Sequence, residues 1–295
     1  MSALTNIHNE LTRRFASTQF AGDLIETLKT DANEAGDTYI DTVFSYDSDA
    51  YTSYNATRYR LGTSYMWFAK PGGTYDFSAV DVDTIQAGID SHGSETYPLV
   101  INIEQWDMKT EYAEAIPNLI TVASMWRDVS NRELGFFKLT PKSDYWLWHW
   151  LYAGVNGSDE EQEARYTSLA STWWDRNNQN YAQLKDYIDF LAPRCYVNYN
   201  GSQSNWNWYA AASIAEAVRL ADGEKKVYPF VWYYAQGDND YLTEAEWVSS
   251  LQFVTSQPGV DGVMVYHDAR MPGAYEWRDA VSEIATATGD FAPPV

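Results

Sequence analysis

The 295-residue sequence predicts an α/β fold, namely a TIM-like (β/α)8 barrel with an N-terminal helical extension. Three observations favour this fold class. From residue 64 onward, short apolar runs of strand type alternate with amphipathic helical stretches. Polar and aromatic residues gather where the apolar runs end, as at the carboxyl ends of barrel strands. No glycine-rich phosphate loop follows the first strands, which argues against a nucleotide-binding doubly wound sheet.

The first part of the chain is expected to pack against the barrel. Apolar positions among helix formers in residues 4–33 predict one or two helices, and residues 39–44 predict a strand. The polar, tyrosine-rich stretch 45–64 has no clear period and is interpreted as a long ordered loop. We therefore divide the chain into residues 1–63, an N-terminal helical extension and loop, and residues 64–295, the barrel. The two parts together form a single structural unit.

The barrel elements follow in order. Apolar runs predict strands at residues 65–69, 99–104, 135–139, 190–197, 227–233 and 262–266. Helical periodicity predicts helices at residues 83–89, from Pro117 onward, and at 162–188, 206–221 and 275–287. Thr243 and Glu246 have the spacing of a capping box, which predicts a helix from there to about residue 255. Further short strands in the first third and near residues 147–151 would bring the barrel close to eight strands.

Composition limits the classes of ligand. The chain has 13 Trp, 23 Tyr and 11 Phe, more than one core of this size needs, so many should line a surface that stacks on sugar rings or on bases. The formal net charge of −21 repels a phosphate backbone and argues against nucleic acid. The expected partner is therefore a polysaccharide or oligosaccharide, and the oligomeric state stays open.

Cysteine content and hydropathy indicate which covalent links, metal sites and cellular locations to expect. The single cysteine, Cys195, excludes an internal disulfide and a cysteine-based zinc site, and no metal or cofactor is expected. No apolar stretch reaches the roughly 18 residues of a membrane span, and the polar N-terminal stretch lacks the apolar region of a signal peptide. High acidity without disulfides favours an extracellular or phage-associated protein. A cytoplasmic location is the alternative.

The stretch Pro98–Lys109 (PLVINIEQWDMK) contains the first candidate catalytic residue, Glu104. The apolar run Leu99–Ile101 has the composition of a strand buried on both faces, and Glu104 follows as it ends. Desolvation at such a position favours the protonated carboxyl that a general acid needs. The alternative role for Glu104 is an ion pair at the barrel rim.

Asp268 and Tyr199 complete the candidate catalytic set. Asp268 follows the last strand, where a second carboxylate about 5 Å from Glu104 would indicate a retaining glycosidase, and one about 6.5–9.5 Å away an inverting glycosidase. A helix N-cap or a salt bridge is the alternative for Asp268. Tyr199 would donate a hydrogen bond to a sugar or to developing charge, with packing as its alternative.

Residues after the predicted strands form the candidate substrate-binding set. They are Asn102, Trp106, Lys70, Lys138, Lys142, Asn198, Tyr233, Tyr234, Gln236, Tyr266 and Trp148. Amides and tyrosines would donate hydrogen bonds, tryptophans would stack on sugar rings, and lysines would favour an anionic sugar such as a uronate. Core packing of the aromatic residues and solvated loops for the lysines are the alternatives.

The order of several segments resembles the barrel of the hyaluronidase-type glycoside hydrolases and, more distantly, of the chitinase-type enzymes. The segments, within about residues 64–285, are NIEQW, GFFKLTPKSDYW, FLAPRCYVNY, VYPFVWYY and GVDGVMVYHD. The resemblance implies that Glu104 donates the proton to the glycosidic oxygen. The family's aspartate, which steadies the acetamido group of the substrate, falls on Asn102, and its late-strand tryptophan falls on Tyr266. Because an amide cannot offset positive charge, the resemblance implies the same architecture with altered chemistry.

The sequence thus favours a glycoside hydrolase that cleaves a polysaccharide with Glu104 as general acid. Two alternatives stay open. A polysaccharide lyase would use a Tyr or His base to take the proton beside a uronate carboxylate held by lysine. A non-catalytic carbohydrate-binding barrel would bind glycans without turnover.

Overall fold

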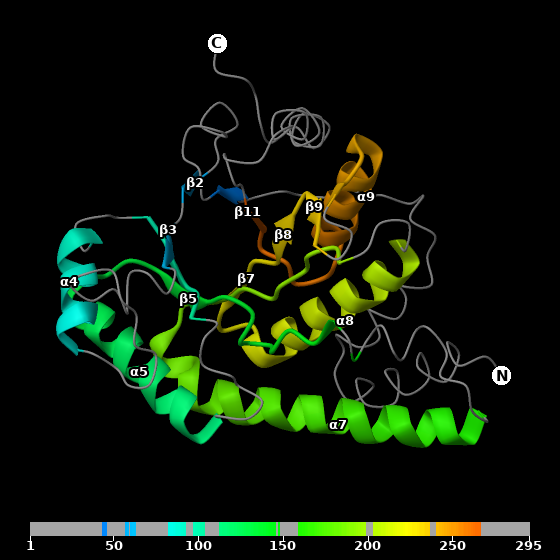
Figure 1. The fold of residues 1–295 in the computed structure, drawn as a ribbon, viewed down its shortest axis with the longest axis horizontal. Helices are drawn as coiled ribbons and strands as arrows, with labels where there is room; N and C mark the ends of the chain where they lie inside the picture. The colour runs from blue at the N-terminus through cyan, green and yellow to red at the C-terminus, as the bar shows by residue number, and fades with distance from the viewer. Residues whose placement is uncertain are drawn as a thin grey trace, which may run out of the picture.

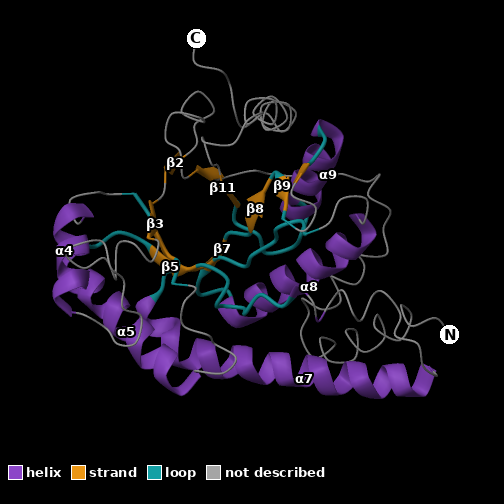
Figure 2. Cartoon of the chain, viewed as in Figure 1, coloured by secondary structure: helices purple, strands orange, loops and turns teal. Residues whose placement is uncertain are grey.

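The computed structural model describes residues 43–45, 57–58, 60–62, 82–92, 97–103, 112–145, 147, 159–198, 203–236 and 240–266. The helices of this part are α4 (Val82–His92), α5 (Tyr112–Val129), α7 (Asp159–Leu184), α8 (Gln203–Ala221) and α9 (Glu244–Thr255). Figures 1 and 2 show short strands gathered centrally, with α4 and α5 on one flank, α9 on the other, and the long α7 along one side beyond α8.

The strands are short and mostly parallel. Two of them, β1 (Val43–Ser45) and β11 (Val263–Tyr266), form one sheet with β2 (Thr57–Arg58) and β8 (Phe230–Trp232) in the order β2, β1, β11, β8. A second sheet has the order β3 (Arg60–Gly62), β4 (Leu99–Ile101), β5 (Leu134–Phe136). β6 (Phe190–Leu191) pairs with β7 (Lys226–Val227), and β9 (Tyr234–Ala235) pairs antiparallel with β10 (Asp240–Tyr241).

Single parallel bridges connect these sheets. Phe137 bridges to Ala192, which joins the chain after β5 to the chain after β6, and Arg194 bridges to Phe230 in β8. The parallel strands therefore follow one another as neighbours from β3 through β4, β5, β6 and β8 to β11 and β1. Because all these pairings are parallel, the carboxyl ends of the strands lie on one side.

The predicted eight-stranded closed barrel is confirmed only as a coarser arrangement, an α/β fold with parallel sheets and surrounding helices. Within the described residues the hydrogen-bonded strands form separate sheets and no closed barrel. Proline explains two interruptions, because it has no N–H to donate to a ladder. Pro229 separates β7 from β8, and Pro193 separates the two bridging residues after β6.

Two expectations for single elements need correction, and others lie outside the described residues or remain open. Stretch 45–64 was expected to be a loop, but it contains β2 and β3, which pair with β1 and β4. The helix expected to start at Pro117 begins at Tyr112, so Pro117 lies inside α5. The helices expected in residues 4–33 and 275–287 and the strand at 65–69 lie outside the described residues. The division of the chain at residue 63 stays a prediction.

Several expected elements are confirmed. The end of the predicted strand 39–44 lies in β1 (Val43–Ser45), while residues 39–42 lie outside the described residues. The helices at 83–89, 162–188 and 206–221 correspond to α4, α7 and α8. The capping box at the start of α9 is present, because the Thr243 hydroxyl accepts a hydrogen bond from the Glu246 N–H and the Glu246 carboxylate accepts one from the Thr243 N–H. None of the described helices is long and apolar enough to span a membrane.

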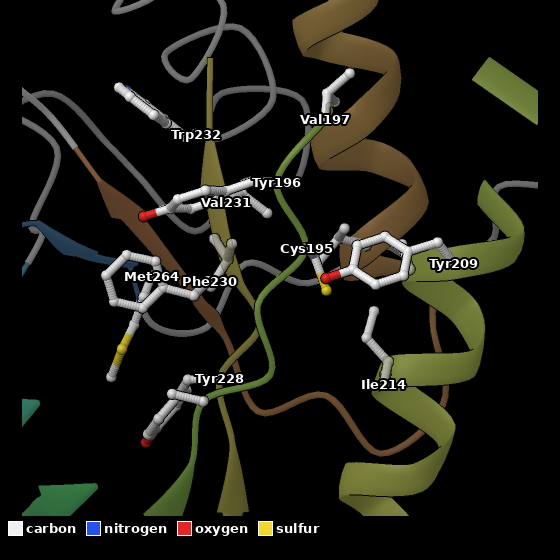
Figure 3. Close-up of a cluster of buried hydrophobic side chains, with 14 of the residues drawn as sticks. Cys195, Tyr196, Val197, Tyr209, Ile214, Tyr228, Phe230, Val231, Trp232 and Met264 are labelled. Atoms are coloured by element: carbon white, nitrogen blue, oxygen red, sulfur yellow. The ribbon is translucent and has the colours of Figure 1, made fainter. Parts of the chain in front are cut away.

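The buried residues form two hydrophobic clusters, one around the strands and α8 and one where α4 and α5 pack on β4 and β5. Figure 3 shows how neighbouring residues of one strand segment face opposite sides, as the period of a strand requires. The Cys195 side chain faces α8, near Tyr209 and Ile214. Tyr196 points away from α8 and packs with Phe230, at a ring distance of 5.9 Å. The segment then continues through Val197 and Asn198 toward the carboxyl side of the sheets.

Candidate functional site

The carboxyl ends of the parallel strands bring together several residues predicted to bind substrate. Asn102 follows β4, and Lys138 and Lys142 follow β5. Asn198 follows the β6 segment, and Gln236 follows β9. Tyr266 is the last residue of β11. Five of these six side chains are half-buried, and Gln236 is exposed.

A half-buried arginine, Arg194, organises the polar part of this region. Its guanidinium donates hydrogen bonds to Asn198 Oδ1 at 3.2 Å, to Gln236 Oε1, and to Ser143 Oγ at 3.4 Å. The backbone N–H of Gln236 donates to the Val197 carbonyl at 3.1 Å. The segments after β5, β6 and β9 therefore converge on one guanidinium.

Arg194 has no carboxylate partner among the described residues. Its guanidinium carbon lies 4.9 Å from the centroid of the Tyr196 ring, a cation–π contact. Its remaining contacts are with neutral oxygen atoms. Among the described residues, the guanidinium is therefore held by neutral acceptors and a ring face.

Tyr209 of α8 supports this arrangement from the core side. Its hydroxyl donates to the Arg194 carbonyl at 2.5 Å and lies 2.8 Å from Ser143 Oγ. Burial raises the pKa of Tyr209 to about 12, although the nearby Arg194 charge lowers it. Tyr209 therefore keeps its proton over the physiological pH range and remains a donor to the Arg194 backbone.

Aromatic rings lie beside the polar cluster. The Trp232 ring contacts Tyr196 at 5.3 Å, Tyr234 at 4.9 Å and Tyr266 at 5.1 Å between centroids. Tyr196 and Trp232 are only 5% and 8% exposed, whereas Tyr234 and Tyr266 are half-buried. The two half-buried tyrosines thus rest on a buried aromatic base, and aromatic rings at such a site are suited to stacking on an apolar sugar face.

Tyr233, predicted to bind substrate, lies on the opposite side of its strand. Its ring is 1% exposed, stacks on Tyr241 at 5.8 Å with an interplanar angle of 7°, and meets Trp247 of α9 at 6.1 Å. The side chain packs between the sheet and α9. The alternation that exposes Tyr234 accounts for this placement, because consecutive strand residues face opposite sides.

The segment after β5 is anchored to α7. The Lys142 N–H donates to Asn177 Oδ1 at 2.9 Å, and the Lys142 carbonyl accepts from Trp173 Nε1 at 2.7 Å. Lys138 has a positive φ of 54°, and its ammonium lies 5.8 Å from the Phe137 ring centroid. Both lysines are half-buried and follow the carboxyl end of β5, as the sequence predicts.

The remaining predicted site residues are Glu104, Asp268, Tyr199, Lys70, Trp106 and Trp148, and they lie outside the described residues. Their roles stay predictions. The last described residues before Glu104 are Asn102, which is half-buried, and Ile103, which is 4% exposed. No group of three or more His, Cys, Asp or Glu side chains suited to a metal ion occurs in the described part of the chain.

Sequence reasoning missed Arg194, Tyr196 and Ser143. A signal for Arg194 was present, because it is a charged residue inside the apolar run Phe190–Val197, where a cation needs a partner or a function. Tyr196 was hidden among many tyrosines. Ser143 carries no pattern of its own, and only the fold brings it to Arg194.

Among known proteins, the chain is similar to solved structures but to no family model or curated sequence. No protein-family model matches the chain, and no curated protein matches its sequence. Two solved structures of bee venom hyaluronidase are similar. A monoclinic crystal structure has a TM-score of 0.57 at 13% identity, covering 84% of this chain and 99% of that chain. A complex with a hyaluronic acid tetramer has a TM-score of 0.52 at 14% identity, covering 85% and 96%.

These similarities confirm the resemblance to the hyaluronidase-type barrel at the level of the fold. At 13% and 14% identity, the similarity establishes the fold alone. The chemistry of the site has to be inferred from the residues of this chain. The polar and aromatic groups described above are those residues.

Proposed function

We propose that the chain is a glycoside hydrolase that acts on a polysaccharide at the carboxyl ends of its parallel strands. The observation that carries the proposal is the fold similarity to a hyaluronidase over 84% of this chain and nearly the whole of that enzyme. Barrel enzymes place their active sites on the carboxyl side of the strands. Here that side carries Arg194, two amides and partly exposed tyrosines.

Glu104 is the general acid in this proposal. The chain runs from the fully buried β4 through Ile103 directly to Glu104. An acid placed there would protonate the glycosidic oxygen as the bond breaks. Asp268, two residues beyond the end of β11, is the proposed second carboxylate, and Tyr199 follows Asn198 as the proposed donor to developing charge.

The proposed binding residues divide by chemistry. Asn102, Asn198 and Gln236 offer amides, while Tyr234 and Tyr266 offer ring faces and hydroxyls. Lys70, Lys138 and Lys142 would attract an anionic sugar, and Trp106 and Trp148 would stack on sugar rings. The similar hyaluronidase was crystallised with a hyaluronic acid tetramer, which supports a polysaccharide substrate for this chain. Such a substrate fits an extracellular or phage-associated protein.

We also propose that the sheets close into a ring. β2 and β3 are separated by one residue, and they pair with β1 and β4 respectively. A single strand over residues 57–62 would therefore join the first sheet to the second. Together with the bridges between β5, β6 and β8, this gives a barrel of about seven parallel strands, one fewer than the sequence predicts.

Substitution of the proposed acid tests the function. We expect Glu104→Gln to lower polysaccharide cleavage by at least about a hundredfold, because the amide keeps the shape but cannot donate a proton in the transition state. The measurement is digestion of a polysaccharide panel followed by mass analysis of the products. Glu133→Gln is the matched control, since the Glu133 carboxylate is 41% exposed and pairs with Lys226 away from the site.

Full activity of Glu104→Gln, with Glu133→Gln also active, would remove Glu104 from the mechanism. The same digests separate the alternatives. A lyase would release products with a new double bond that absorbs ultraviolet light, whereas a hydrolase would add one water molecule for each glycosidic bond that it cleaves. Binding of a panel sugar without any cleavage would indicate the non-catalytic barrel.

A further inference from the structure

Two side-chain amides meet at a single guanidinium. The same terminal nitrogen of Arg194 donates to Asn198 Oδ1 and to Gln236 Oε1. Asn198 is half-buried and Gln236 is exposed, and the Gln236 backbone is fixed to Val197. The two amides come from different strand ends, and Arg194 is the side chain that contacts both of their oxygens.

The chemistry of the guanidinium determines which atom of each side-chain amide, the oxygen or the nitrogen, faces Arg194. Arginine has five N–H donors and no acceptor, so it can hold an amide only through the oxygen. Each NH2 group must then point away from Arg194. Neither amide nitrogen has a hydrogen-bond partner among the described residues, whereas both oxygens are engaged. The pair therefore presents its N–H donors outward, while each oxygen is turned toward Arg194.

The half-buried residues Tyr234 and Tyr266 both contact the ring of Trp232. Tyr266 lies opposite Trp232 in the neighbouring strand β11, and Tyr234 lies in β9, which follows β8 along the chain. Tyr234, the first residue of β9, lies two residues before Gln236 in the sequence. Outward donors and partly exposed ring faces thus occur at the same end of the sheets. A sugar bound there would present an apolar face to a ring and oxygen atoms to the amides.

We propose that Arg194 is a positioning residue that orients Asn198 and Gln236 as a pair of hydrogen-bond donors for acceptor oxygens of the bound glycan. This inference rests on the proposed function. It makes the subsite favour sugar groups that accept hydrogen bonds, such as a carbonyl oxygen, because the N–H donors of both amides point outward. Leaving a donor unmatched in a closed complex costs affinity, which is how selectivity arises.

Two variants of Gln236 separate donor function from structural support. Gln236→Glu keeps an oxygen for Arg194 but removes the N–H donors, and Gln236→Met removes both. We expect both variants to raise the Kd for a neutral N-acetylglucosamine tetramer or a hyaluronan tetrasaccharide by about fivefold or more, measured by titration calorimetry on the full chain. The melting temperature of Gln236→Glu should equal or exceed that of Gln236→Met, because its carboxylate can pair with Arg194.

The neutral tetramer excludes simple charge repulsion as the cause of a loss in Gln236→Glu. If Gln236→Glu binds this sugar as the wild type does while Gln236→Met is weaker, the oxygen contact alone matters and the donor assignment is overturned. Equal binding by the wild type and both variants also overturns it. A wild-type chain that binds no sugar of the polysaccharide panel overturns the proposed function, and the inference with it.

A double-substitution cycle tests whether Arg194 acts through the amide. Arg194→Lys keeps the charge but cannot hold two oxygens in the planar geometry of a guanidinium. If Arg194 positions Gln236, the loss of affinity in Arg194→Lys with Gln236→Met should be no larger than the greater single loss. A purely structural role would give additive losses and would change kcat along with KM, whereas the positioning role raises KM alone.

Discussion

Gly135 lies in the middle of β5, against the ring of Phe190 from β6. A Cβ atom added at this glycine would lie 2.2 Å from Phe190 Cε2 and 2.6 Å from Phe190 Cδ2. Both residues are buried, and Phe190 is 0% exposed and meets Tyr228 at a ring distance of 5.6 Å. The close approach of β5 to β6 therefore depends on a missing side chain, since close-packed interiors do not yield by an ångström without cost.

We expect Gly135→Ala to lower the free energy of unfolding by about 1–3 kcal/mol, because the methyl group overpacks the contact with Phe190. Urea unfolding of the variant and of the wild type measures the loss. Phe190→Val should also destabilise the fold by leaving a cavity, yet the double variant should lose less than the sum of the two single losses. Additive losses would show that Phe190 is not the group that excludes the methyl.

At the scale of elements, a polar interface joins α7 to α8. The Glu216 carboxylate is fully buried and accepts two hydrogen bonds from Arg219, at 2.7 and 2.8 Å. Arg219 also donates to Asn178 Oδ1 of α7 at 2.7 Å. Burial raises the pKa of Glu216, while the hydrogen bonds and charge of Arg219 act in the opposite direction. The net direction is upward, so ionised Glu216 is less favourable in the folded chain than in water.

This shift predicts a pH dependence of stability. Because the folded-state pKa of Glu216 lies above the unfolded value of about 4.3, the folded chain binds the proton first as the pH falls. The free energy of unfolding should therefore rise relative to Glu216→Gln as the pH falls through the folded pKa, and level off below about pH 4. Each unit of pKa difference contributes about 1.4 kcal/mol.

Urea unfolding at a series of pH values from 7 to about 4 measures this difference. Comparison with Glu216→Gln cancels the protonation of the many other carboxylates, and Glu133→Gln serves as a control at an exposed ion pair. Parallel stability curves for the wild type and Glu216→Gln would contradict a raised pKa.

The lengths of the elements explain why the sequence predicts the helices better than the strands. α7 and α8 span 26 and 19 residues, so their periodicity is visible over many turns. β2 and β3 have two and three residues, too few for a period, and lie in a polar, tyrosine-rich stretch. Pro117 carries the local signal of a helix start, but the apolar face of α5 extends one turn further back and includes Ala115 and Ile116, which are each 1% exposed.

For the whole molecule, the strand order decides which residues form the site. The sequence alone indicated that polar residues follow each strand, which brought Asn198, Gln236 and Tyr266 into consideration. It could not show that one guanidinium joins two of them, because that contact spans 42 residues and depends on the bridge from Arg194 to Phe230. Long-range register of this kind is a property of the assembled sheets.

The position of Leu61 makes the proposed ring testable. Leu61 in β3 is 7% exposed, pairs with Val100 of β4, and belongs to the same apolar cluster as Val263 of β11 and Phe230 of β8. If residues 57–62 close the ring, Leu61 is a core residue of the barrel. If the segment only packs on its outside, truncation of Leu61 removes a peripheral contact.

We expect Leu61→Ala to lower the free energy of unfolding by about 2–5 kcal/mol, the range for a buried leucine, with one cooperative transition followed by both fluorescence and circular dichroism. Val82→Ala is the matched control, because Val82 is 54% exposed and its truncation should change stability by less than about 0.5 kcal/mol. An equally small loss for Leu61→Ala, or a separate early transition for the N-terminal segment, would contradict closure. Such a result would instead support the division of the chain at residue 63, with the barrel complete without that strand.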